Sequence, residues 1–351
     1  MEVKSVKAFG NTSPEADLKA MAINRRMVTL KDVEIDILYC GVCHSDLHFA
    51  KNDWGMSEYP VVPGHEIVGK VTRVGDGVSK YQVGDLVAVG CLVDSCRTCN
   101  NCKEDLEQYC SEWIATYGGP DKHLGSHTFG GYSESIVVDE DFVLRLPDNL
   151  DLAGIAPVLC AGITTWSPLR HWKVGKDSTV AVVGLGGLGH MAIKLAAALG
   201  AHVTLFSRST NKIEDAKALG ANEVIISTDE SQMEQAMGKF DLIIDTVPYA
   251  HDLNPYVGTL ATNGTLVVVG YLGPLDPMLV TVPLIMGRKT VAGSLIGGIA
   301  ETQELLDFCG KHNIISDVEV INIQEINEAF QRMLKSDVHY RFVIDMKSIK
   351  D

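Results

Sequence analysis

Residues 179–189 read Thr-Val-Ala-Val-Val-Gly-Leu-Gly-Gly-Leu-Gly, and this stretch decides the fold of the second half of the chain. Its first five residues form an apolar run typical of a buried parallel strand. Gly184-Leu185-Gly186-Gly187-Leu188-Gly189 then matches GxGxxG, directly before a helix predicted over 188–199. In this context the glycines allow a tight turn and bring backbone amides close to a pyrophosphate at a helix N-terminus. A dinucleotide site is favoured over a plain glycine turn.

Strand and helix signals alternate beyond this turn. Strands are predicted at 202–206, 223–226, 240–244, 265–269 and 291–294, with a helix over 211–219. This alternation predicts an α/β fold with a doubly wound parallel sheet, the Rossmann domain, over 155–294. The region 1–154 instead shows short strands separated by Gly, Pro and Asp, at 33–38, 67–74, 86–89 and 135–138, which predicts a β-rich domain. The tail 295–351 holds two predicted helices and a strand at 341–344, and we expect it to return to the first domain.

The residues at the end of the second Rossmann strand select the cofactor. An NAD site places a carboxylate there for the ribose 2′-hydroxyl. This chain instead has Ser207, Arg208 and Ser209, with Lys212 one turn further on. Two cations and no carboxylate favour a 2′-phosphate, so we predict NADP(H) as cofactor. The alternative is a polar, solvated loop without a binding role.

Four cysteines lie close together, with two, two and seven residues between them: Cys96, Cys99, Cys102 and Cys110. Four thiolates at this spacing predict a closed structural Zn²⁺ site in a lobe over 91–112. Disulfides are the weaker alternative, because cysteines two residues apart make strained bridges. A four-thiolate site has no open position, so catalysis needs other residues.

Composition narrows the function classes. The chain has 351 residues and a net charge of −15, which argues against nucleic acid or an anionic membrane as a partner. Nine cysteines, without an apolar leader or an apolar run long enough to span a bilayer, fit a soluble protein of a reducing compartment. We expect a cytoplasmic protein with a small-molecule substrate. Cys40, Cys91 and Cys309 show no ligand-like partners and are predicted to be core residues.

A second metal set is spread along the chain. Cys43, His65 and Cys160 form a set of two cysteines and one histidine, which is used in open catalytic zinc sites. Two zinc ions per chain are therefore predicted, one structural and one catalytic.

With these motifs in place, the chain resembles a zinc-dependent medium-chain alcohol dehydrogenase of the cinnamyl alcohol dehydrogenase branch. The pattern Gly64-His65-Glu66-x-x-Gly69-x5-Gly75-x-x-Val78, the cysteine lobe and the glycine turn stand in that family's order. The resemblance covers essentially the whole chain, and within the branch it is greatest to bacterial broad-specificity NADPH-dependent aldehyde reductases. It implies a GroES-like fold for the β-rich domain and a homodimer that pairs through 284–296.

The resemblance also assigns roles to single residues. It implies that Glu66 approaches the metal, that Asp46 orients the ligand imidazole, and that Ser45 and His48 relay a proton. Asp46 could alternatively cap the following helix. Further cofactor contacts are implied for Thr164, Val247 and Ser294. Trp54, Trp113, Leu295 and Ile296 either line the substrate pocket or pack in the core.

The function implied is the reversible NADPH-dependent reduction of aldehydes to primary alcohols, of aromatic, cinnamyl-type and aliphatic kinds. One alternative is reduction of a conjugated C=C bond on the same fold. A second is a non-catalytic dinucleotide-binding sensor, which would need neither an open zinc position nor a proton relay.

Overall fold

The computed structural model describes residues 2–271 and 273–350. The chain divides into two compact units, Met1–Cys160 with Gly297–Asp351, and Ala161–Ile296. The sequence predicts domain boundaries at 154/155 and 294/295, whereas the units of the structure meet at 160/161 and 296/297. The short helix η3 (Ala156–Leu159) packs against strands β3 and β5 of the first unit, which keeps Cys160 in that unit.

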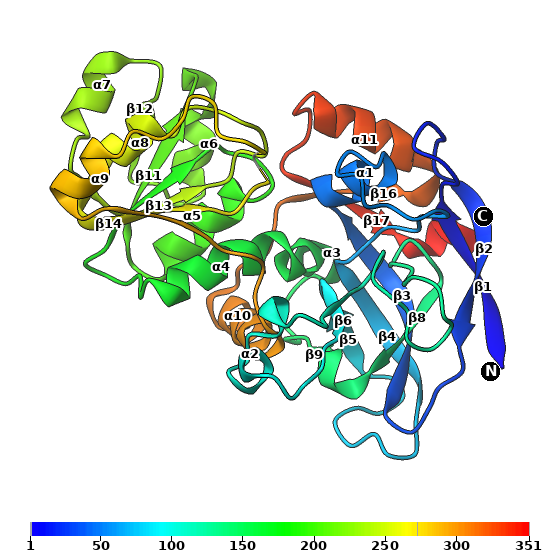
Figure 1. Cartoon of the computed structure of the whole chain (residues 1–351). Helices are drawn as coiled ribbons and strands as arrows, with labels where there is room; N and C mark the ends of the chain where they lie inside the picture. Colours follow the sequence, from blue (N-terminus) through cyan, green and yellow to red (C-terminus); the bar gives the residue numbers. More distant parts are fainter. Residues whose placement is uncertain (1, 272, 351) are drawn as a thin grey trace. The chain divides into compact units, whose positions relative to one another are not determined.

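The second unit contains a six-stranded sheet with the order β12-β11-β10-β13-β14-β15, drawn in green to orange in Figure 1. Every neighbouring pair of strands is parallel. The strands are β10 (Thr179–Val183), β11 (His202–Ser207), β12 (Glu223–Ile226), β13 (Phe240–Asp245), β14 (Leu260–Val268) and β15 (Thr290–Gly293). The order reverses direction at β10 and β13, so the predicted doubly wound Rossmann sheet is confirmed.

Six helices connect or flank these strands in the described part of the second unit. They are α4 (Ala161–His171), α5 (Gly189–Ala198), α6 (Ile213–Ala218), α7 (Glu230–Gln235), α8 (Asn254–Thr259) and α9 (Val282–Gly287). The sheet has a core of buried aliphatic and aromatic side chains, with Phe206 and Phe240 packed edge to face. This packing fixes the carboxyl ends of the strands, where a dinucleotide binds in this fold.

The first unit is built on a seven-stranded sheet in which β16, β17, β3, β4, β5 and β9 follow one another and β8 also pairs with β3. The strands are β3 (Asp32–Val42), β4 (Ile67–Val74), β5 (Leu86–Val89), β8 (Ser135–Asp139), β9 (Leu144–Arg145), β16 (Val318–Asn322) and β17 (Arg341–Asp345). The tail thus returns to the first unit, where β17 pairs antiparallel with the central strand β3.

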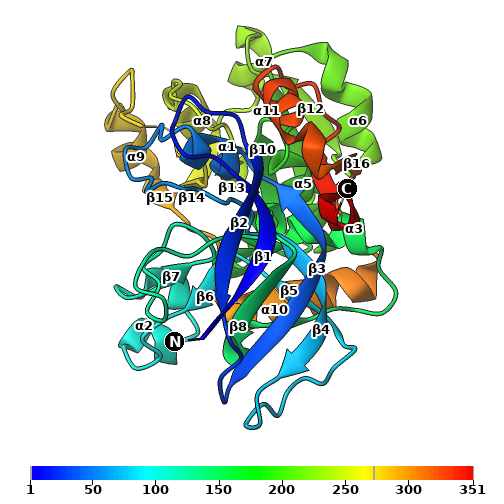
Figure 2. The same cartoon turned by 90° about the vertical axis from the view of Figure 1, so that its right-hand side faces the viewer.

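Smaller elements complete this unit. Strands β1 (Val3–Gly10) and β2 (Lys19–Arg26) pair with each other, as Figure 2 shows in dark blue, and β6 (Leu92–Asp94) pairs with β7 (Ile114–Ala115). The helices are α1 (His44–Ala50), α2 (Asn100–Lys103), α3 (Leu152–Ile155), α10 (Ile299–His312) and α11 (Ile326–Leu334). The sequence predicted neither β2 nor β16, because both are amphipathic segments without a clear apolar run.

Within the described residues, no single helix has both the length and the hydropathy needed to cross a membrane. The bent pair 152–159 and 161–171 passes that test only when the two helices are taken together.

Candidate zinc and dinucleotide sites

The first site joins three segments of the first unit that are far apart in sequence. Cys43 is the N-cap of α1 directly after β3, His65 and Glu66 directly precede β4, and Cys160 follows η3. One ligand atom from each of these four residues lies within 4.8 Å of the other three, and all four residues are buried. The structure therefore brings together all four predicted ligands of the catalytic zinc.

The donor atoms fit a zinc ion. Cys43 Sγ and Cys160 Sγ are 3.9 Å apart. Two sulfurs that are each about 2.3 Å from a tetrahedral zinc would lie about 3.8 Å apart. In the described part of the chain, His65 Nε2 and Glu66 Oε2 are buried without a hydrogen-bond partner, so both are available as ligands. The contact between the two thiols lowers the pKa of Cys43 and raises that of Cys160.

Asp46 lies beside His65 and also caps α1. Its Oδ1 lies 3.6 Å from His65 Nδ1, which leaves Nε2 of the same ring for the metal. Its Oδ2 accepts from the backbone N–H of Cys43 at 2.8 Å, as the N3 residue of a capping box. The two roles weighed for Asp46 are therefore compatible, since different oxygens serve them.

Glu66 is held by an arginine from the other end of the chain. Arg341 Nη2 donates to Glu66 Oε1, and both side chains are buried. A Cβ at Gly41 would lie 1.9 Å from Glu66 Oε2. The Glu66 carboxylate therefore fits against β3 only because residue 41 is glycine. Burial raises the pKa of Glu66 to about 7, although Arg341 acts against that shift.

The two predicted relay residues lie on α1. Ser45 Oγ is 3.6 Å from Cys43 Sγ, beside the metal ligands. His48 Nδ1 lies 2.7 Å from Asp53 Oδ2, so Nδ1–H donates to that carboxylate. This tautomer leaves His48 Nε2 as the atom that can exchange a proton.

The second cluster lies within a single lobe of the first unit. Cys96, Cys99, Cys102 and Cys110 also place their sulfurs within 4.8 Å of one another, and Cys110 is the buried member. All nine cysteines are free in the structure, and the clustered sulfurs of the lobe favour a metal site over disulfides. Backbone N–H groups of Thr98 and Cys99 lower the pKa of Cys96 to about 6, which favours the thiolate that zinc requires.

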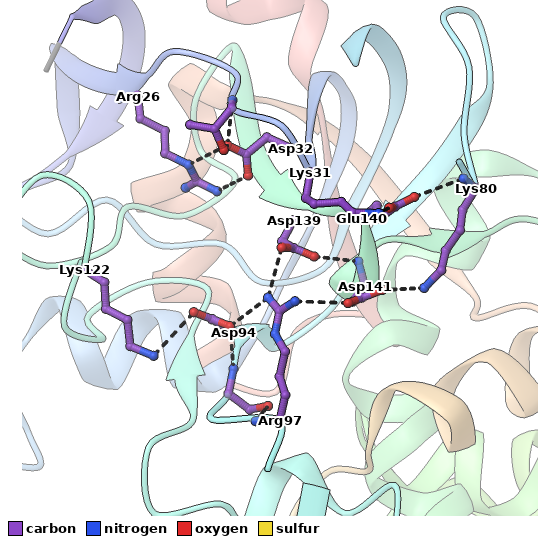
Figure 3. Close-up of polar contacts among 12 residues, drawn as sticks. Arg26, Lys31, Asp32, Lys80, Asp94, Arg97, Lys122, Asp139, Glu140 and Asp141 are labelled. Carbon is purple, nitrogen blue, oxygen red and sulfur yellow. Dashed lines mark hydrogen bonds and ion pairs between the residues drawn. The ribbon is translucent and has the colours of Figure 1, made fainter. Parts of the chain in front are cut away.

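Ion pairs fasten this lobe to the rest of the first unit. Arg97, between two of the cysteines, pairs with Asp94 at 3.0 Å, Asp139 at 3.1 Å and Asp141 at 3.0 Å (Figure 3). Its guanidinium also lies over the ring of Phe142. Since Asp139 ends β8 and Asp141 follows it, the contacts tie the lobe to the main sheet.

The glycine turn lies at the carboxyl end of β10 in the second unit. A Cβ at Gly189 would lie 2.1 Å from the carbonyl oxygen of Gly184, so only glycine lets α5 begin this close to the strand. A Cβ at Gly186 would meet nothing within 4 Å, which leaves the turn open on the side where a pyrophosphate is expected. His190 Nδ1–H donates to the Gly186 carbonyl oxygen at 3.1 Å and braces the turn.

The predicted ribose-binding residues follow β11. Ser207 is buried, and its hydroxyl donates to the carbonyl oxygen of Ser209 at 2.8 Å. Arg208 is exposed and Lys212 is half-buried, and no ion pair occupies either cation in the described part of the chain. Among the other predicted cofactor residues, Thr164 is buried in α4, Val247 follows β13, and Ser294 follows β15.

The four candidates for the substrate pocket belong to different units. Trp54 is half-buried and lies 5.6 Å from His48, ring centroid to ring centroid. Trp113 is half-buried next to the cysteine lobe. Leu295 and Ile296 end the second unit, where Leu295 is exposed.

Sequence reasoning missed several residues that act on these sites. Cys91 is not a fully buried core residue, and its thiol donates to the carbonyl oxygen of Leu159, next to Cys160, at 3.7 Å. Arg341 stands out in the sequence only as a charge opening an apolar strand. Asp53 and His190 carry no pattern of their own, although His190 directly follows the third glycine of the motif.

Comparison with known proteins agrees with this architecture. The family model for the alcohol dehydrogenase GroES-like domain matches residues 30–148, and the model for zinc-binding dehydrogenases matches residues 187–311. The chain belongs to the zinc-binding alcohol dehydrogenase family. The predicted GroES-like fold of the first unit is thereby confirmed.

Similar members of the family include reductases and dehydrogenases. The aldehyde reductase YahK of Escherichia coli is 51% identical over 99% of this chain and 99% of its own length. A cinnamyl alcohol dehydrogenase structure from Sorghum bicolor has a TM-score of 0.95 and 44% identity, covering 98% of both chains. The structure of CAD from Helicobacter pylori, complexed with NADP(H), has a TM-score of 0.91 and 43% identity over 99% of both chains. The predicted cinnamyl alcohol dehydrogenase branch is confirmed.

Proposed function

We propose that this protein is a zinc-dependent oxidoreductase that reduces aldehydes to primary alcohols with NADPH, and that runs in reverse as an alcohol dehydrogenase. The observation that carries the proposal is the set Cys43, His65 and Cys160, in which His65 Nε2 has no hydrogen-bond partner among the described residues, with the Glu66 carboxylate beside it and paired to Arg341. Such a set leaves a coordination position for a substrate oxygen. The names of the reductase and dehydrogenase relatives support the same reaction class.

The reaction needs charge stabilisation, a hydride and a proton. When bound, zinc supplies a Lewis acid for the carbonyl oxygen, and NADPH supplies the hydride. Ser45 Oγ, beside the metal ligands, gives its proton to the oxygen that becomes the alcohol. His48 Nε2 returns a proton from solvent, since Asp53 holds Nδ1–H in place. Trp54, which lies against His48, and Trp113 are proposed to contact the aldehyde.

NADPH is proposed over NADH because of the end of β11. Ser207, Ser209, Arg208 and Lys212 present hydroxyls and cations there, and no carboxylate stands among them. The NADP(H) complex of the Helicobacter relative supports this preference.

A direct assay tests the proposed function. Purified protein with two zinc ions per chain is mixed with NADPH and cinnamaldehyde, the absorbance of NADPH is followed, and the product is identified by chromatography. We expect cinnamyl alcohol, with NADH used less well. A saturated aldehyde as product would favour the C=C reductase, and tight NADPH binding without turnover would favour the sensor. Equal use of NADH would contradict the cofactor preference.

The proposed homodimer pairs through 284–296. Strand β15 forms one edge of the six-stranded sheet. Apolar side chains of α9 next to it are strongly exposed, with Ile285 at 75% and Met286 at 82%. An unpaired edge beside such side chains is typical of an interface. Light scattering should give twice the chain mass, and Ile285→Glu should give monomers. We also propose a cytoplasmic location, in keeping with nine unbridged cysteines.

A further inference from the structure

A contact across the end of the Rossmann sheet joins two loops. Arg208 directly follows β11, and Tyr249 lies on the segment that follows β13. The guanidinium carbon of Arg208 lies over the Tyr249 ring, 6.0 Å from its centroid. Strands β11 and β13 flank β10 and run parallel to it, so their carboxyl ends share the edge that carries the glycine turn. The contact therefore connects the loops on either side of that turn.

Tyr249 is itself held in place by the end of β13. His251 Nδ1–H donates to the Tyr249 carbonyl oxygen at 2.9 Å, and the two rings meet edge to face. The other nitrogen of His251 lies 3.4 Å from Oδ2 of the buried Asp245. The second carboxylate oxygen of Asp245 accepts from the Val247 N–H. The loop is thus anchored to the sheet on both sides of Tyr249.

Arg208 has spare hydrogen-bonding capacity. Its side chain is exposed, and no carboxylate pairs with it among residues 2–271 and 273–350. A cation–π contact depends on the charge of the guanidinium and needs none of its N–H donors. The ring therefore restrains the cation without using the donors that a phosphate needs.

We propose that Tyr249 is a positioning residue for NADPH recognition, which holds the Arg208 guanidinium at the end of β11 where it meets the 2′-phosphate. The proposal rests on the NADPH preference proposed above. An exposed cation–π contact corresponds to about a two- to fivefold change in affinity. Tyr249 is 50% exposed, so its replacement leaves the core intact.

The test measures binding of NADPH and of NADH to the zinc-loaded protein by nicotinamide fluorescence. Tyr249→Leu removes the ring, and Tyr249→Phe is the matched variant that keeps it. We expect Tyr249→Leu to weaken NADPH binding about two- to fivefold without changing NADH binding. Tyr249→Phe should retain the wild-type ratio of the two affinities. In kinetics, the KM for NADPH should rise for Tyr249→Leu while kcat stays the same.

A double-mutant cycle tests whether Tyr249 acts through Arg208. In an Arg208→Gln background, Tyr249→Leu should have no further effect on NADPH binding. Equal weakening of NADPH and NADH would overturn the proposal, because Tyr249 would then support the adenosine in general. An unchanged affinity ratio in Tyr249→Leu would overturn it too. If the wild type itself binds both cofactors equally, the proposed NADPH preference is wrong. If the wild type prefers NADPH and Tyr249→Leu keeps that preference, only the role of Tyr249 is wrong.

Discussion

The two cysteine-containing sites of the first unit use similar donor atoms but are assembled in opposite ways. The four ligands of the lobe lie between residues 96 and 110, and three of them are only half-buried. The ligands of the other site come from residues 43, 65, 66 and 160, and all are buried. The lobe is closed by short loops, whereas the second site exists only because β3, β4 and η3 pack together.

This difference in assembly indicates a different role for the metal at each site. In the lobe, zinc supplies folding free energy, because little else holds the short segments around it together. In the catalytic site the protein holds the ligands first, through the contact of Asp46 with His65 and the pairing of Arg341 with Glu66. Cys43, His65 and Cys160 would leave a bound zinc one position, which a substrate oxygen could take in place of Glu66.

The largest effect is expected at the open site. Cys43→Ser should reduce kcat/KM by about a thousandfold or more, because zinc contributes several kcal/mol to stabilising the developing negative charge. Elemental analysis should find one zinc per chain, with an unchanged circular dichroism spectrum. Cys309→Ser, at a buried cysteine outside both clusters, is the matched control and should keep two zinc ions. Full activity of Cys43→Ser would contradict the assignment.

Removing a ligand of the lobe should mainly destabilise the protein. Cys99→Ser is expected to lower the free energy of unfolding by about 5 kcal/mol, a fraction of what structural zinc contributes to small domains. Urea unfolding of the zinc-loaded protein measures this change. Molecules that remain folded should keep most of their activity per catalytic zinc. The reverse pattern, an inactive but fully stable variant, would show that the two metal roles are exchanged.

Breaking the buried ion pair tests how the open site is preorganised. Arg341→Met should cost about 3–5 kcal/mol in unfolding free energy, since it leaves the Glu66 carboxylate buried without its partner. The double variant Arg341→Met/Glu66→Gln should recover most of this loss, because no buried charge remains. Chemical denaturation of the three proteins provides the comparison, and a double variant no more stable than Arg341→Met would contradict the explanation.

A carboxylate near the lobe should make stability depend on pH. Lys31 and the backbone N–H groups of Ser79 and Lys80 outweigh burial and lower the pKa of Glu140 to about 2. Figure 3 shows Glu140 with Lys31 and Lys80. Its contribution is therefore fully present above about pH 4.5, the ordinary value, and is lost as pH falls toward 2. Glu140→Gln should cost about 1.5–3 kcal/mol at pH 7. In denaturation experiments, the difference in unfolding free energy between Glu140→Gln and the wild type should shrink below about pH 4.5. A difference that stays constant with pH would contradict the stabilising role of the Glu140 carboxylate.

The smallest effect is expected where the lobe is fastened to β8. Arg97→Ala removes partly exposed ion pairs, which are worth about 1 kcal/mol or less in total stability. Zinc release from the lobe to a coloured chelator should nevertheless become faster, while release from the open site should not change. Lys103→Ala is the control, because Lys103 lies on α2 of the same lobe and forms no ion pair with any residue that the structure describes. An unchanged release rate would show that the ion pairs do not restrain the lobe.

Local patterns predicted much of the fold. The limits of β4, β5, β10 and β12 agree with the strands predicted at 67–74, 86–89, 179–183 and 223–226, since each is rich in β-branched or aliphatic residues. Strand β14 begins at Leu260, before the predicted 265, because its pairing with β13 continues across a register shift. The amphipathic strands β2 and β16 escaped prediction because pairing with neighbours, not a long apolar run of their own, makes them strands.

By itself, the sequence determined the lobe, the glycine turn and the family, because each depends on residues a few positions apart whose geometry the short chain between them limits. Only the tertiary structure decided that Arg341 meets Glu66, through the pairing of β17 and β4 with opposite sides of β3. It likewise decided that Tyr249 meets Arg208. Such contacts depend on which strands become neighbours, and that is set by burial of the whole core, not by any local pattern.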